Sequence, residues 1–185
     1  NEAATRESLI REFSLYDQAG DGDICLFSYS GHGSRNDAPE AFWHLEPDRL
    51  NESLVMWDSR TEGGRDLMDK ELSYLIWKAT NGKNLQFIAL MDCCHSGSGT
   101  RNSEEVRSRM AEKGNDVRGL EEMLGYEVYK KDSDGKLSPP QGRHILLAGA
   151  RHNQAAKELT LGGATRGVFT FSLLETLRQY GNQLT

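Results

Sequence analysis

The stretch Leu90-Met91-Asp92-Cys93-Cys94-His95-Ser96-Gly97-Ser98-Gly99 is an apolar run that ends abruptly in an acid, two thiols and a glycine-rich turn. Residues 85–91 are almost continuously apolar, which predicts a strand buried on both faces of a parallel sheet. Open α/β sheets bind their ligands beyond the carboxyl ends of such strands. We therefore interpret the stretch as one wall of an active site and Cys94 as the candidate nucleophile.

A second apolar run, residues 24–30, ends in Gly31-His32-Gly33 and predicts another buried strand. Because neighbouring parallel strands end at one edge of a sheet, this turn is expected to bring His32 near Cys94. A cysteine nucleophile needs a partner that favours the thiolate and N–H donors for the oxyanion. His32 is the candidate partner, and the backbone N–H groups of Gly33 and Cys94 are the candidate donors. Cys/His pairs also occur by chance, so these residues alone leave a structural role open.

The rest of the chain alternates predicted strands with amphipathic helices, which indicates one layered α/β domain over residues 1–185 with a mainly parallel sheet. Thr5 is expected to cap a first helix, and Asp66 a second. Residues 145–150 predict a third buried strand. A closing helix is predicted over residues 168–180.

Two long polar stretches are predicted to lie at the surface. Residues 34–53 contain two prolines and many acids, which is typical of a loop. Residues 102–142 interleave basic and acidic side chains, which predicts a solvated excursion between the nucleophile-bearing part and the C-terminal part.

Charge and cysteine usage limit the class of protein. Lys and Arg number 22 against 28 Asp and Glu, which gives a net charge of -6 and argues against nucleic-acid binding. Three cysteines, two of them adjacent, are a poor disulfide framework and indicate a reducing compartment, so we predict a cytoplasmic location. No apolar run approaches the roughly 20 residues that cross a bilayer, and no membrane partner is expected.

Ser30-Gly31-His32-Gly33 followed by Asp92-Cys93-Cys94-His95-Ser96-Gly97 resembles the paired signature of the caspase-like cysteine peptidases, most closely the bacterial metacaspase-like branch. Two motifs in the family's order, each after an apolar strand, make the resemblance specific. The similarity continues through residues 66–72, 148–158 and 167–170 and covers most of the chain. It implies a caspase-like three-layer sandwich with a mainly parallel central sheet and flanking helices.

The resemblance also assigns roles by position. It implies that Cys94 is the nucleophile, that His32 is its partner and that Gly33 contributes an oxyanion donor. It further implies that Asp92 and Ser30 line the primary specificity pocket, so that the enzyme cleaves after a basic residue.

The chemistry of Asp92 supports that role independently. A carboxylate at the end of a buried strand is costly to desolvate unless a cation or several donors satisfy it. A substrate guanidinium does so through two parallel hydrogen bonds, which favours Arg over Lys. The alternative is a structural acid held by local backbone N–H groups. Cys93 is expected to pack, because successive residues of an extended segment face opposite ways.

The chain departs from the family pattern at two points. Calcium-dependent relatives use paired acids near the position of Asp69, whereas its neighbour here is Lys70, so we expect no metal and no cofactor. The family's first strand and helix, and its last strand, have no counterpart before Asn1 or after Thr185. We therefore expect a piece of a larger polypeptide, or a chain that missing segments or a companion chain complete.

The predicted function is a cysteine endopeptidase that hydrolyses proteins or peptides after Arg or Lys through a Cys94–His32 dyad and an acyl-enzyme. Self-cleavage within residues 102–137, or a partner, is expected to activate it. The alternative is a catalytically inactive module that keeps the fold and binds a partner through the same groove. A zinc site at residues 93–95 is disfavoured, because three consecutive residues do not readily converge on one tetrahedral ion.

Overall fold

The computed structural model describes residues 2–94, 106–150, 154, 156–161 and 163–183. Its centre is a parallel sheet of three strands in the order β1-β5-β9, formed by β1 (Ile24–Ser30), β5 (Gln86–Asp92) and β9 (Ile145–Ala148). The register pairs Ser30, the last residue of β1, with Asp92, the last residue of β5. Both predicted motif strands are confirmed, and they end at the same edge of the sheet.

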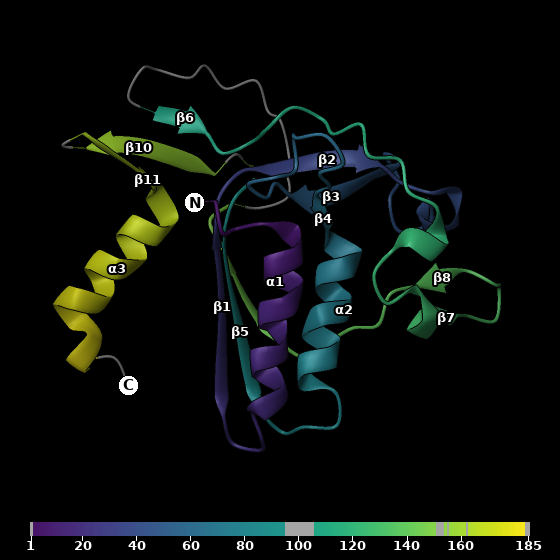
Figure 1. Ribbon diagram of the computed structural model, residues 1–185. Coiled ribbons are helices and arrows are strands. Elements are labelled where there is room, and N and C mark those ends of the chain that lie inside the picture. The colour runs from purple at the N-terminus through teal and green to yellow at the C-terminus, as the bar shows by residue number, and fades with distance from the viewer. Residues whose placement is uncertain (1, 95–105, 151–153, 155, 162, 184–185) are drawn as a thin grey trace.

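Helices flank this sheet on both sides, as Figure 1 shows. Helix α1 (Arg6–Glu12), the 3-10 turn η1 (Phe13–Gln18) and helix α2 (Asp69–Thr80) lie on one side of β1 and β5. Helix α3 (Val168–Tyr180) lies on the other side, followed by η5 (Gly181–Gln183). The main core fills the space between the sheet and the first two helices, and its aromatic members are Phe13, Phe27 and Phe87. The chain therefore has the predicted three-layer α/β architecture.

The first helix begins as its sequence predicts, whereas the second does not. The Thr5 hydroxyl accepts a hydrogen bond from the Ser8 N–H at 3.1 Å, which caps α1. Asp66 is fully buried immediately before the short strand β4 (Leu67–Met68), and it caps no helix. At the start of α2, the Glu71 carboxylate accepts from the Met68 N–H at 3.0 Å.

The polar stretch over residues 34–53 is a pair of strands, not the predicted surface loop. Strands β2 (Gly33–Asp37), β3 (Leu50–Leu54) and β4 form an antiparallel sheet, with η2 (Glu40–Phe42) between the first two. Asn36 and Ser53 are buried and both donate to the Asp66 carboxylate at 2.9 Å. This buried polar cluster explains why a stretch with few apolar residues is folded, since buried polar groups need partners.

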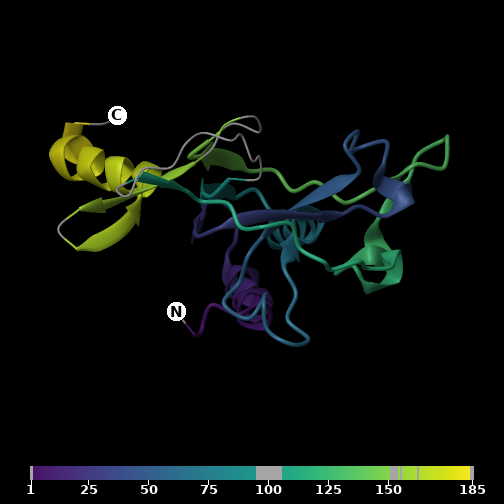
Figure 2. The same cartoon turned by 90° about the horizontal axis from the view of Figure 1, so that it is seen from above.

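The charged excursion is packed in several places, whereas residues 130–136 are all exposed, so only part of the described segment is solvated as expected. Strand β6 (Val106–Ser108) joins β10 (Lys157–Leu161) and β11 (Ala164–Gly167) in a third sheet. The chain then runs along β2, forms η3 (Leu120–Glu122) and η4 (Tyr126–Val128), and pairs β7 (Lys130–Lys131) with β8 (Leu137–Ser138). Met123, Tyr129 and Leu137 form a second small core with Phe42 and Met68. Figure 2 shows that the β7–β8 hairpin and the α3–β10–β11 unit lie at opposite ends of the molecule.

One face of the central sheet carries exposed apolar side chains. Strand β9 is exposed at every position, which corrects the prediction that it is buried, and Leu146 is 55% exposed. On β1, Cys25 and Phe27 face the core, while Ile24 and Leu26 are 69% and 55% exposed. Within the described residues, no helix is long and apolar enough to span a membrane.

Candidate active site

The two sequence motifs lie side by side because β1 and β5 end in register. The Gly31 N–H donates to the Asp92 carbonyl at 3.3 Å, which extends the ladder one step beyond the strands. The Val55 N–H donates to the His32 carbonyl at 3.0 Å, and the Tyr29 hydroxyl lies 2.8 Å from that same oxygen. These contacts hold the His32 turn against the end of β3.

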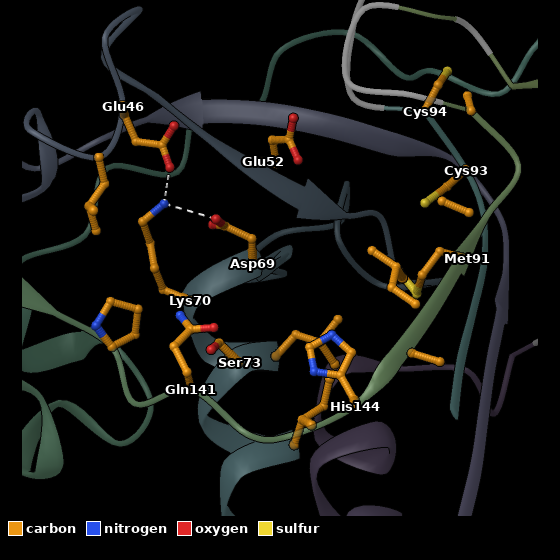
Figure 3. Close-up of a pocket in the computed structure, with 18 residues that line it drawn as sticks. Glu46, Glu52, Asp69, Lys70, Ser73, Met91, Cys93, Cys94, Gln141 and His144 are labelled. Carbon is orange, nitrogen blue, oxygen red and sulfur yellow. Dashed lines mark hydrogen bonds and ion pairs between the residues drawn. The ribbon is translucent and has the colours of Figure 1, made fainter. Parts of the chain in front are cut away.

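The two adjacent cysteines have different surroundings. Cys93 belongs to the main core, which confirms its predicted packing role, and burial together with Cys94 raises its pKa to about 12. Its sulfur and that of Cys94 point in different directions in Figure 3. The Cys94 sulfur lies 3.4 Å from the Ser108 hydroxyl oxygen, and the residue is 1% exposed. His32 is exposed, and no hydrogen bond joins its ring to Cys94 in the described part of the chain.

Two backbone N–H groups converge on one carbonyl oxygen beside Cys94. The Gly33 N–H donates to the Arg109 carbonyl at 3.0 Å, and the Cys94 N–H donates to the same oxygen at 3.3 Å. They are the two donors expected from the sequence to stabilise an oxyanion. A carbonyl held by two fixed donors is polarised, and the donors strengthen as negative charge develops on its oxygen.

Asp92 and Ser30 also meet at this point, around the guanidinium of Arg109. Its Nη1 lies 3.3 Å from the Asp92 carboxylate and donates to the Ser30 hydroxyl at 2.9 Å. The Asp92 Oδ2 atom also accepts from the Thr170 N–H, in the first turn of α3, at 2.8 Å. Its Oδ1 atom is buried without a hydrogen-bond partner. Asp92 is thus held by one backbone N–H from a distant helix and one cation, not by a set of local N–H groups.

The walls of this pocket come from the end of β11 and the start of α3. Gly167 lies so close to the Arg109 guanidinium and the Asp92 carboxylate that a Cβ atom there would overlap both. A cavity of about 490 Å³ opens beside them, lined by Ser30, Arg109, Gly167 and the first turns of α3. The absence of a side chain at position 167 therefore makes room for a guanidinium above Asp92.

A second cavity, of about 500 Å³, lies between α2 and the sheet and reaches Cys93 and Cys94 (Figure 3). Three acids, Glu46, Glu52 and Asp69, stand at its far end. The Lys70 ammonium pairs there with Glu46 and with Asp69, the latter at 2.9 Å. The buried Lys70 side chain thus supplies a positive charge to two of these three acids. No group of three or more metal-binding side chains is found among the described residues.

Comparison with known proteins gives the family. The model of the metacaspase, peptidase C14 domain matches residues 1–101, more than half of the chain. The chain belongs to the metacaspase family. This confirms the resemblance that its two motifs indicate.

Individual metacaspases are similar over parts of their length. Metacaspase-1 of Plasmodium falciparum is 44% identical over 78 residues, which are 42% of this chain and 12% of that protein. Metacaspase-1 of Lodderomyces elongisporus is 25% identical over 97% of this chain and 46% of its own length. The crystal structure of protein GSU0716 from Geobacter sulfurreducens superposes with a TM-score of 0.60 at 25% identity, covering 95% of this chain and 63% of that one. The matched region thus spans less than half of the length of each of these two metacaspases.

The residues that surround Asp92 were only partly predictable. Ser30, His32, Gly33, Asp92 and Cys94 gather at one edge of the sheet, as the motifs predict, whereas His95 lies outside the described residues. Sequence reasoning missed the contacts of Arg109, Gly167 and Thr170. Gly167 lies in a stretch that resembles the family, and that was the available signal. No sequence signal pointed to Arg109, because it is one of several basic residues in the charged excursion.

Proposed function

We propose that this chain is the catalytic part of a cysteine endopeptidase that hydrolyses peptide bonds after a basic residue. The observation that carries the proposal is the convergence of the Gly33 and Cys94 N–H groups on one carbonyl oxygen, beside the Cys94 thiol. Membership of a peptidase family supports the same reaction. The proposed nucleophile is Cys94, and His32 is its acid–base partner.

The reaction proceeds in two steps. The Cys94 thiolate attacks the carbonyl carbon of the scissile bond, and the Gly33 and Cys94 N–H groups stabilise the resulting oxyanion. The C–N bond breaks, His32 gives a proton to the leaving amine, and a thioester remains on Cys94. Water then gives a proton to His32, attacks the thioester and releases the carboxylate product and the thiolate.

The proposed preference for Arg rests on the charge and burial of the Asp92 pocket. Asp92 is 1% exposed and its Oδ1 atom is without a hydrogen-bond partner, so it gains from a second N–H of a bound cation. A guanidinium presents several N–H donors in a fixed plane, whereas an ammonium presents a point charge. Ser30 offers a further acceptor on the same cation. Substrates with Arg before the cut are therefore expected to react faster than those with Lys.

We further propose that the peptidase needs neither calcium nor another cofactor, because Lys70 already neutralises the acids near Asp69. Cys25, Cys93 and Cys94 form no disulfide, which suits a reducing compartment such as the cytoplasm. Additional segments or a companion chain are proposed to cover the exposed face of β1 and β9, where Ile24 and Leu146 are exposed.

The test is turnover of a fluorogenic peptide with Arg before the reporter group. Cys94→Ala is expected to lower turnover by about a thousandfold or more, as removal of other catalytic nucleophiles does. Cys93→Ala is the matched control, since it removes the neighbouring thiol, and it is expected to retain turnover. Thermal unfolding of both variants checks the fold. Full activity of Cys94→Ala would refute the assignment. No turnover by the unaltered chain, with Cys94 unreactive to alkylation, would favour the inactive module.

A further inference from the structure

The segment Val106-Arg107-Ser108-Arg109 runs through the active site as an added strand. Strand β6 pairs antiparallel with β10, with Ser108 opposite Lys157 and Val106 opposite Leu159. The Arg109 N–H continues this ladder and donates to the Ala156 carbonyl at 3.0 Å. Main-chain pairing of this kind is a common way to hold an extended peptide, because it does not depend on the peptide's side chains.

Arg109 meets all of the groups that the proposed reaction assigns to the residue before the cut. Its carbonyl oxygen accepts from both proposed oxyanion donors, at 3.0 and 3.3 Å. Its guanidinium lies against Asp92 and Ser30, and its side chain is buried. The nucleophile is adjacent, because the Cys94 sulfur lies 3.4 Å from the hydroxyl of Ser108, the preceding residue.

The chain on the far side of Arg109 is held by different elements. Met110 pairs with Gly33 in a β-bridge, and the Ala111 N–H donates to the Gly33 carbonyl at 2.8 Å. Further on, the Gly114 N–H donates to the Arg35 carbonyl at 2.8 Å. The Arg109–Met110 bond is therefore anchored through β10 on one side and through β2 on the other.

We infer that the Arg109–Met110 peptide bond is a self-cleavage site, and that residues 106–109 fill the substrate groove until the bond is cut. This inference rests on the proposed function and adds to it a specific bond and an occupant of the groove. No other basic residue of the described excursion has its carbonyl oxygen on the Gly33 and Cys94 N–H groups.

The cleavage follows the proposed chemistry atom by atom. The Cys94 sulfur bonds to the Arg109 carbonyl carbon, and the carbon–nitrogen bond to Met110 breaks as its nitrogen takes a proton from His32. Water hydrolyses the thioester, which leaves Arg109 with a free carboxylate and Met110 with a free amine. The upstream product then keeps only its β10 pairing and pocket contacts, so an incoming peptide can compete for the groove.

The test compares four versions of the full chain by intact mass and N-terminal sequencing, with the arginyl reporter assayed in parallel. The unaltered chain and Arg107→Ala are expected to yield a fragment that begins at Met110. Arg107 is the matched control, because it is an exposed arginine two residues before the proposed cut. Cys94→Ala and Arg109→Ala are expected to stay intact.

A fifth variant guards against loss of the fold. Arg109→Lys keeps a cation beside Asp92 and is expected to be cut at the same bond, several-fold more slowly than the unaltered chain. Reporter turnover by a chain whose 109–110 bond stays intact, or is cut only elsewhere, would overturn this inference and leave the proposed function standing. A chain that cuts neither itself nor the reporter would overturn both.

Discussion

Replacing Asp92 with Asn separates recognition of the basic residue from catalysis. The amide keeps an oxygen that can accept the Thr170 N–H, now 2.8 Å from the carboxylate, so the start of α3 stays capped. It removes the negative charge that faces the guanidinium. A hydrogen bond to a charged group contributes about 1.5 to 3 kcal/mol. At about 1.4 kcal/mol per tenfold, kcat/KM for an arginyl reporter is expected to fall about 10- to 150-fold.

The assay compares that reporter with one that carries Gln or Met before the cut. Turnover of the neutral reporter is expected to change little or to rise, since Asp92→Asn leaves Cys94 and both oxyanion donors in place. Asp134→Asn is the matched control, because Asp134 lies in the exposed turn between β7 and β8. Equal losses on both reporters, or no loss on the arginyl reporter, would refute the assignment of Asp92 as the specificity acid.

Three further predictions follow from the packing around the site. Gly167→Ala places a methyl group where the Arg109 guanidinium and Asp92 meet, and overpacking of about 1 to 3 kcal/mol is expected to slow arginyl turnover at least several-fold. Reporter turnover is expected to be the same in excess EGTA and in millimolar calcium, because the Lys70 ammonium already pairs with the acids; strong calcium activation would contradict this. Burial raises the pKa of Cys93 from 9.0 to about 12, so the folded state favours the thiol. This preference contributes up to about 4 kcal/mol to the free energy of unfolding below pH 9, and the contribution is lost as the pH rises to 12. Urea titrations of Cys93→Ala are therefore expected to show a shallower alkaline loss of stability.

The central part of the fold could be predicted because its signals are local. The apolar runs ending at Ser30 and Asp92 are strands, and the side-chain cap at Thr5 depends on a residue three positions away. The exposure of β9 could not be predicted from its own sequence. Whether Leu146 is covered depends on which other elements lie over the sheet, and an apolar run carries no information about them.

The errors arose where polar residues pair across long stretches of sequence. Asp66 has the residue type of a helix cap, but Asn36, Ser53 and Arg60 bind it from elsewhere in the chain. Arg109 has the same character as other basic residues in a polar segment. Its place in the candidate active site is set by contacts with Asp92 and with the Gly33 and Cys94 N–H groups, and these contacts appear only when β1 and β5 are folded side by side.

Covalent labelling by an arginyl peptide chloromethyl ketone tests the central claim most directly. The Cys94 thiolate is expected to displace chloride and form a thioether, located by mass spectrometry of the digested protein. The account predicts an adduct on Cys94, slower labelling by a probe with a neutral residue in place of Arg, and no adduct on Cys25 or Cys93. Failure to label Cys94, or equal labelling of the three cysteines, would contradict the assignment of Cys94 as the nucleophile of an arginine-directed peptidase.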